Sequence, residues 1–205
     1  MNNKLIILTA QAISVLFSPF YFPVVAFVAL FLFSYLNVLP VTYKVLFVAI
    51  VWLFTIGIPR LCILLYRKVN GWTRHQIGRR ENRYVPYLFS ICSYAALLYF
   101  MKLLHLPHFT LGIIAGALLI QILGTLLNPW IKMCPHSAAA GGVIGALIAF
   151  SLIFMFNPVS WLCLVVLLNG LVGTSRLILR QQTFMEISTG TIVGILCGFF
   201  CIAYV

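Results

Sequence analysis

Apolar residues occur along this chain in long runs that short polar stretches separate. A helix needs about 20 apolar residues to cross a hydrocarbon core roughly 30 Å thick. Two shorter runs, 5–17 and 24–36, are separated by Pro19 and Pro23, so they form either one crossing or two. We therefore expect an all-α integral membrane protein, a bundle of about six to seven transmembrane helices. The other apolar runs are 44–66, 85–104, 109–127, 137–156, 158–174 and 187–205.

The run at 44–66 contains Pro59 and Arg60. Proline removes a helical hydrogen bond, so we expect a kink at this point. The one sustained polar stretch, 67–83, follows directly. A chain of 205 residues allows one compact bundle without a separate soluble domain, and we expect a single domain spanning 1–205.

Glycines recur at four-residue spacing in three of the apolar runs. In a lipid environment such spacing lets two helix backbones approach closely. We interpret it as tight packing inside one bundle, with a homodimer seam as the alternative. The sets are Gly112/Gly116, Gly141/Gly145 and Gly190/Gly194/Gly198.

Composition agrees with the hydrophobic pattern. Apolar residues make up 63% and charged residues 7% of the chain, against roughly 45–50% and 25% in soluble domains. The net charge of +11 suits an anionic lipid surface, and nucleic acid is not an expected partner because nearly every segment is apolar. The six cysteines lack paired spacing, and Glu81 and Glu186 lie far apart, so we expect no disulfide framework, metal or cofactor.

Three polar segments each precede an apolar run: the first at 80–83, the second at 132–137 and the third at 175–186. Two crossings separate each segment from the next, so all three must lie at the same membrane face. Guanidinium groups that meet there would bind a phosphate whose lipid tail stays in the bilayer. The basic and histidine side chains of this predicted pocket are Arg80, Arg83, Lys132, His136 and Arg176, with Arg180 as an optional sixth member.

The third polar segment resembles the third signature of the PAP2 lipid-phosphate phosphatases, Ser-Arg-x5-His-x3-Asp. Ser175 and Arg176 match its first two positions, and Glu186 supplies the terminal carboxylate. The histidine of the signature, which is the nucleophile in that family, falls on Gln182. An amide cannot attack phosphorus and carry the phosphoryl group as an imidazole does.

The second and first polar segments resemble the other two PAP2 signatures more loosely. His136 takes the place of the histidine in Pro-Ser-Gly-His, although the three residues before it differ. Arg83 matches the arginine of Lys-x6-Arg-Pro, with the proline displaced to Pro86. Gln76 stands at the lysine position, for which either Arg80 or Arg79 is a substitute.

The resemblance covers about residues 18–205 and is closest to small, divergent PAP2-like proteins of Bacteroidetes-type bacteria. It implies a single PAP2-like membrane domain, with divergent N-terminal helices at 1–40 and a motif-bearing core at 67–200. It also implies a bacterial inner membrane with the site at the periplasmic face. Counting Lys and Arg by the positive-inside rule gives the opposite orientation; we keep the periplasmic face as the expectation.

The resemblance also implies roles for individual residues. His136 is the general acid that protonates the leaving alkoxide, Glu186 is the orienting carboxylate, and Gln182 occupies the nucleophile position. The lipid is phosphatidic acid, phosphatidylglycerophosphate or polyprenyl pyrophosphate. The residues expected to bind its phosphate are Arg80, Arg83, Lys132, Ser137, Ser175 and Arg176.

Gln182 leaves two function hypotheses open. The first is a PAP2-family lipid-phosphate phosphatase that is impaired or inactive as written, whether the glutamine is native or engineered. The second is a non-catalytic protein that binds anionic lipid headgroups or scaffolds a membrane assembly. Hydrolysis by water activated at His136 or Glu186 is a further route within the first hypothesis. A transporter is disfavoured because polar groups within the spans are scarce.

Overall fold

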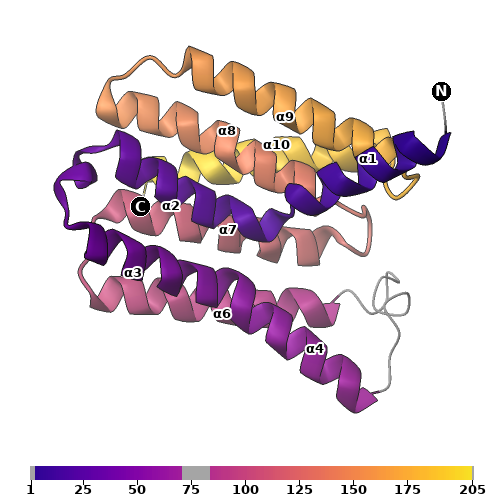
Figure 1. The fold of residues 1–205 in the computed structure, drawn as a ribbon, viewed down its shortest axis with the longest axis horizontal. Coiled ribbons are helices and arrows are strands. Elements are labelled where there is room, and N and C mark those ends of the chain that lie inside the picture. Colours follow the sequence, from indigo (N-terminus) through magenta and orange to yellow (C-terminus); the bar gives the residue numbers. More distant parts are fainter. Residues whose placement is uncertain (1–2, 71–83, 205) are drawn as a thin grey trace.

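The computed structural model describes residues 3–70 and 84–204, in which every regular element is a helix (Figure 1). Seven stretches of these residues are long and apolar enough to cross a membrane. This confirms the predicted helical membrane bundle of six to seven spans. The α-helices are α1 (Asn3–Leu16), α2 (Phe22–Phe33), α3 (Val41–Trp52), α4 (Ile58–Asn70), α6 (Tyr84–Leu103), α7 (His108–Leu127), α8 (Pro135–Phe154), α9 (Val159–Ile178) and α10 (Phe184–Tyr204).

The first candidate span, Ile6–Phe33, is an interrupted helix. The backbone is extended at Ser18, and Pro19 then opens a single 3-10 turn, η1 (Pro19–Tyr21), which leads into α2. Proline suits the first position of a helix because its missing N–H would have no partner there. The two short apolar runs, 5–17 and 24–36, therefore belong to one candidate span.

The second candidate span, Val41–Val69, is interrupted by a π-helical turn, η3 (Leu53–Gly57), between α3 and α4. Pro59 offers no N–H to the carbonyl four residues earlier, and its ring crowds that carbonyl. The helix responds by widening over the preceding turn, as helices do at π-bulges. The predicted kink therefore takes the form of a π-helical turn just before the proline.

The widened turn ties α3 and α4 to α6. The N–H of Ile58 donates to the carbonyl of Leu53, five residues earlier. The Phe54 carbonyl, which would accept that N–H in a regular α-helix, instead accepts a hydrogen bond from the Ser93 hydroxyl on α6. A backbone group freed inside the bundle thus has a partner from a neighbouring helix, as the apolar surroundings require.

Glycines allow α8 and α10 to pack backbone against backbone. A Cβ on Gly145 would lie 2.1 Å from the Ile195 carbonyl oxygen, and one on Gly194 would lie 2.1 Å from that of Ala138. On α7, a Cβ on Gly112 would meet the backbone of α10 at 2.8 Å. This confirms that the glycine spacing serves packing inside one bundle; the homodimer alternative stays a prediction. Gly141, Gly190 and Gly198 show the same close approach.

The helices begin and finish at two opposite ends of the bundle (Figure 1). At one end α4 and α9 finish, and α6, α8 and α10 begin. The turns α2–α3, α6–α7 and α8–α9 lie at the other end with the C-terminus. Near these turns a core forms between α2, α3, α6 and α7, with Phe27, Phe47, Tyr94, Leu97 and Ile114 fully or almost fully buried. The second and third polar segments therefore share one end of the bundle, which we call the polar end.

Candidate functional site

The third polar segment closes α9 with a turn in which a non-glycine residue adopts the left-handed conformation. Arg180 has a φ of 49°. Its N–H donates to the Leu177 carbonyl (2.9 Å), and the N–H of Gln181 donates to the Arg176 carbonyl (3.2 Å). This is the Schellman pattern, which usually has glycine at the left-handed position. The turn sends the chain across the polar end to the start of α10.

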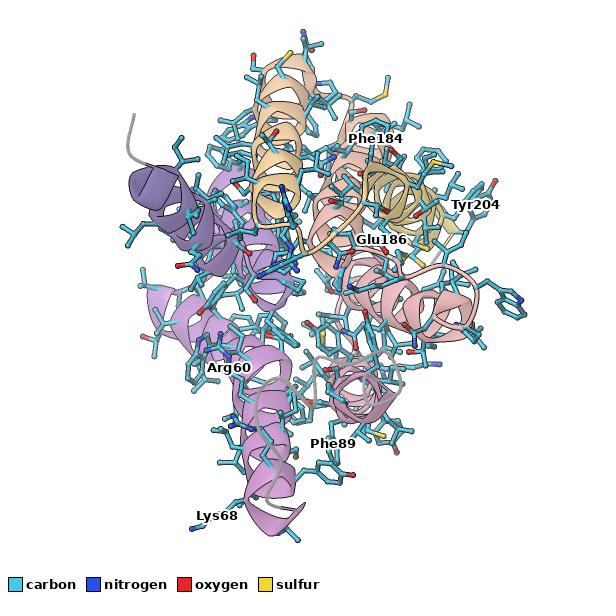
Figure 2. The ribbon with its side chains drawn as sticks, turned by 90° about the vertical axis from the view of Figure 1, so that its right-hand side faces the viewer. Arg60, Lys68, Phe89, Phe184, Glu186 and Tyr204 are labelled. Carbon is cyan, nitrogen blue, oxygen red and sulfur yellow. The ribbon has the colours of Figure 1, made fainter. Side chains whose placement is uncertain are left out.

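A capping box starts α10. The N–H of Thr183 donates to Glu186 Oε2 (3.1 Å), and the N–H of Glu186 donates to Thr183 Oγ1 (3.4 Å). These two bonds satisfy backbone donors that a helix start leaves without partners. The Glu186 carboxylate thus has a structural task at the polar end, where Figure 2 labels it. The role of Glu186 in orienting a nucleophile stays a prediction.

Two hydrogen bonds join the second polar segment to the third. Lys132 Nζ donates to the carbonyl of Gln181 (3.2 Å). The N–H of Cys134 donates to the carbonyl of Glu186 (3.1 Å). Because the Cys134 carbonyl also lies close to α10 at Gly190, the start of α8 is held directly against the start of α10.

His136 lies in the first turn of α8, after Pro135. Its Nδ1 is buried and has no hydrogen-bond partner in the described part of the chain. The ring lies beside the backbone of Ser14 and within the electrostatic reach of the Arg176 guanidinium. Residues from α1, α8 and α9, distant in sequence, therefore meet at this point.

Arg176 reaches across the polar end to α1. Its Nη1 donates to Ser14 Oγ at 2.9 Å, and the Ser14 side chain is buried. Sequence reasoning did not predict α1 at the site, because one hydroxyl in an apolar run commonly bonds its own helix. Only the three-dimensional arrangement identifies Ser14 as part of it.

Gln182, at the predicted nucleophile position, is buried with a relative exposure of 6%. Neither its Oε1 nor its Nε2 has a hydrogen-bond partner among residues 3–70 and 84–204. Burying an amide without partners costs free energy, about 1–3 kcal/mol by mutational measures. A buried donor and acceptor that go unused within the described chain are what a binding site for a polar group requires.

Two predicted phosphate-binding hydroxyls bond locally. Ser175 Oγ donates to the Leu171 carbonyl of its own helix (2.8 Å). Ser137 is fully buried, and its Oγ lies 3.6 Å from Cys134 Sγ. Arg80 and Arg83, the basic residues of the first polar segment, lie outside the described residues, and their part in the site stays a prediction.

The described residues contain no group of three or more His, Cys, Asp or Glu side chains that could hold a metal ion. The arrangement at the polar end instead offers a guanidinium, an imidazole and an amide. Comparisons of the chain with family models, with curated proteins and with solved structures find no match. The PAP2 resemblance therefore rests on the three polar segments alone.

Proposed function

We propose that this membrane protein binds the phosphate headgroup of a lipid at the polar end of its bundle, in the manner of a PAP2 lipid-phosphate phosphatase. The protein does not turn the lipid over through a phosphohistidine, because Gln182 stands at the nucleophile position. The observation that carries the proposal is the placement of Arg176, His136 and buried Gln182 at one end of the bundle, where α9 ends and α8 and α10 begin, with His136 within the electrostatic reach of Arg176.

The chemistry of these groups suits a phosphate. A guanidinium binds phosphate oxygens through charge-assisted hydrogen bonds. The Gln182 amide offers Nε2 to a phosphate oxygen and Oε1 to a phosphate hydroxyl, and both are buried and unused within the described chain. Lys132 adds positive charge from the adjoining segment. The apolar helices let the tail of the same lipid remain in the bilayer.

Because His136 is present as a general acid, the single substitution Gln182→His should be enough to allow hydrolysis. In a PAP2-like reaction His136 would donate a proton to the alkoxide that leaves phosphorus. Without a nucleophile, the site formed by Arg176, His136 and Gln182 binds and polarises a phosphate ester but forms no covalent intermediate. The bound lipid is therefore expected to stay intact, as the non-catalytic hypothesis requires.

The test is a phosphate-release and binding experiment on purified protein in lipid nanodiscs. The probes are phosphatidic acid, phosphatidylglycerophosphate and polyprenyl pyrophosphate, and the variants are Gln182→His and His136→Ala. The unchanged chain should bind at least one probe and release no phosphate. Gln182→His should release phosphate, and adding His136→Ala to it should abolish that release. If the unchanged chain binds none of the three lipids, the proposal fails; if Gln182→His binds without release, its PAP2 part fails.

We also propose that the protein lies in a bacterial inner membrane with its polar end at the periplasmic face, as the PAP2 resemblance implies. Lys68, exposed at the end of α4, gives a position for a single introduced cysteine. In a variant without the native cysteines, Lys68→Cys should react with an impermeant thiol reagent added to intact spheroplasts. Labelling only after lysis would place the polar end in the cytoplasm instead.

A further inference from the structure

Two helix breaks lie against each other in the N-terminal half of the chain. The 3-10 turn η1 interrupts the span Ile6–Phe33, the π-helical turn η3 interrupts the span Val41–Val69, and the two turns are in contact. Broken transmembrane helices and π-bulges recur at ligand sites in membrane proteins. Their meeting is therefore a reason to look for a ligand at this junction.

Arg60 is the charged residue of this junction. It lies in the first turn of α4, directly after Pro59, and its side chain is exposed. At 1.5 Å per residue, about 14 Å of helix separates it from the end of the span at Val69. An exposed side chain at that depth faces the bilayer or a cleft open to it.

Within the described part of the chain, the Arg60 guanidinium contacts Tyr21 of η1. Nη2 donates to the tyrosine hydroxyl at 3.1 Å, and the guanidinium carbon lies 5.5 Å from the centre of the ring. Both contacts orient the cation, but a neutral phenol does not neutralise it. Glu186, the acidic residue among those described, lies on another helix well away from Arg60 in the view from the polar end (Figure 2).

Charged side chains in apolar spans are costly and mark functional sites by default. A guanidinium has five N–H donors, and the Tyr21 hydroxyl uses one of them. A long basic side chain in a span can direct its charged head toward the nearer membrane surface. For Arg60 the nearer surface is the one at the polar end, because the span Val41–Val69 ends closer to Arg60 than it begins and carries Arg67 and Lys68 there.

We propose that Arg60, held by Tyr21 at the junction of η1 and η3, binds the phosphate of an anionic lipid from the leaflet at the polar end. The planar guanidinium matches two phosphate oxygens, and Tyr21 fixes its plane. The ligand is a lipid and not free phosphate, because the cation is exposed within an apolar span. The proposal uses none of the residues of the site built around Arg176 and does not depend on the function proposed for that site.

Native mass spectrometry of the full chain, released from detergent with titrated phosphatidylglycerol, tests this site. The key variant is Arg60→Gln. The matched control is Lys68→Gln, which removes the same charge from an exposed position on the same helix. Arg60→Gln should weaken phosphatidylglycerol binding about tenfold, while Lys68→Gln should change it less than twofold. Phosphatidylcholine, which is zwitterionic, should bind the unchanged chain and Arg60→Gln alike.

Two further variants keep the test decisive if Arg60→Gln folds poorly. Tyr21→Phe removes the hydroxyl that orients the cation and should weaken binding by a smaller factor than Arg60→Gln. Arg60→Lys keeps the charge but loses the fork, and it should fall between the unchanged chain and Arg60→Gln. Millimolar inorganic phosphate should not displace the lipid. Equal losses in Arg60→Gln and Lys68→Gln would show diffuse surface attraction and would overturn the site, as would displacement by free phosphate.

Discussion

The seam between α8 and α10 gives the sharpest stability prediction, through the substitution Gly145→Ala. The new methyl group would lie 2.1 Å from the Ile195 carbonyl oxygen and 2.8 Å from the Phe199 nitrogen. Ordinary van der Waals contact begins at 3.4 Å, so the two backbones would have to separate by about 1 Å. Neither neighbouring atom can rotate away, because both belong to the backbone of α10.

The magnitude follows from two opposing terms. Overpacking of a tight interface costs roughly 1–3 kcal/mol, and a backbone clash belongs at the upper end of that range. Replacing glycine by alanine inside a helix returns up to about 1 kcal/mol. Gly145→Ala should therefore lower the free energy of unfolding by about 2 kcal/mol, mainly by separating α8 from α10.

Two other glycines give matched controls for the same substitution. Gly170 on α9 has no heavy atom within 4 Å of an added Cβ, and the nearest atom to a Cβ on Gly116 is 3.6 Å away. Gly170→Ala should be neutral or stabilising by up to about 1 kcal/mol, and Gly116→Ala should stay within roughly 0.5 kcal/mol of the unchanged chain. Reversible unfolding in mixed micelles with increasing SDS measures all three. Equal stability of Gly145→Ala and Gly170→Ala would refute the close seam.

Three further substitutions test the polar end. Arg180→Gly should stabilise the chain by about 1 kcal/mol, because glycine has no steric cost in the left-handed conformation; an unchanged SDS midpoint would contradict the Schellman turn. Thr183→Ala should cost about 1 kcal/mol by removing the cap of α10, and a loss no larger than that of an exposed Thr174→Ala control would argue against the capping box. Ser14→Ala should weaken phosphatidic acid binding severalfold, whereas Ser14→Thr, which keeps the hydroxyl, should bind like the unchanged chain. In an Arg176→Gln background, Ser14→Ala should cause no further loss. Independent, additive losses would mean that Ser14 does not act through the guanidinium.

The spans could be predicted because length and hydrophobicity are local properties of the sequence. The close packing of glycines could also be predicted from their spacing. Which helices they join could not be predicted, since α8 and α10 meet only after α9 has crossed between them in the chain. At Pro59 only a kink could be predicted. The proline shows that a helical hydrogen bond is lost, but not that the preceding turn widens into a π-helix.

The candidate site was predicted less completely than the fold. Topology placed the second and third polar segments at one end, but Ser14 was missed because its partner Arg176 is 162 residues away. The pair Thr183 and Glu186 carries a capping-box pattern that is visible in the sequence. The family resemblance drew attention instead to a catalytic role for the same carboxylate.

The most direct test of the account compares the affinity of phosphatidic acid for two variants in phosphatidylcholine nanodiscs. Arg176→Gln removes the guanidinium that bonds Ser14 and lies within electrostatic reach of His136, whereas Arg180→Gln removes the same charge from an exposed residue of the same segment. Losing a charge-assisted contact should weaken binding about tenfold in Arg176→Gln and less than twofold in Arg180→Gln. If the two variants bind phosphatidic acid equally well, no specific phosphate site exists around Arg176.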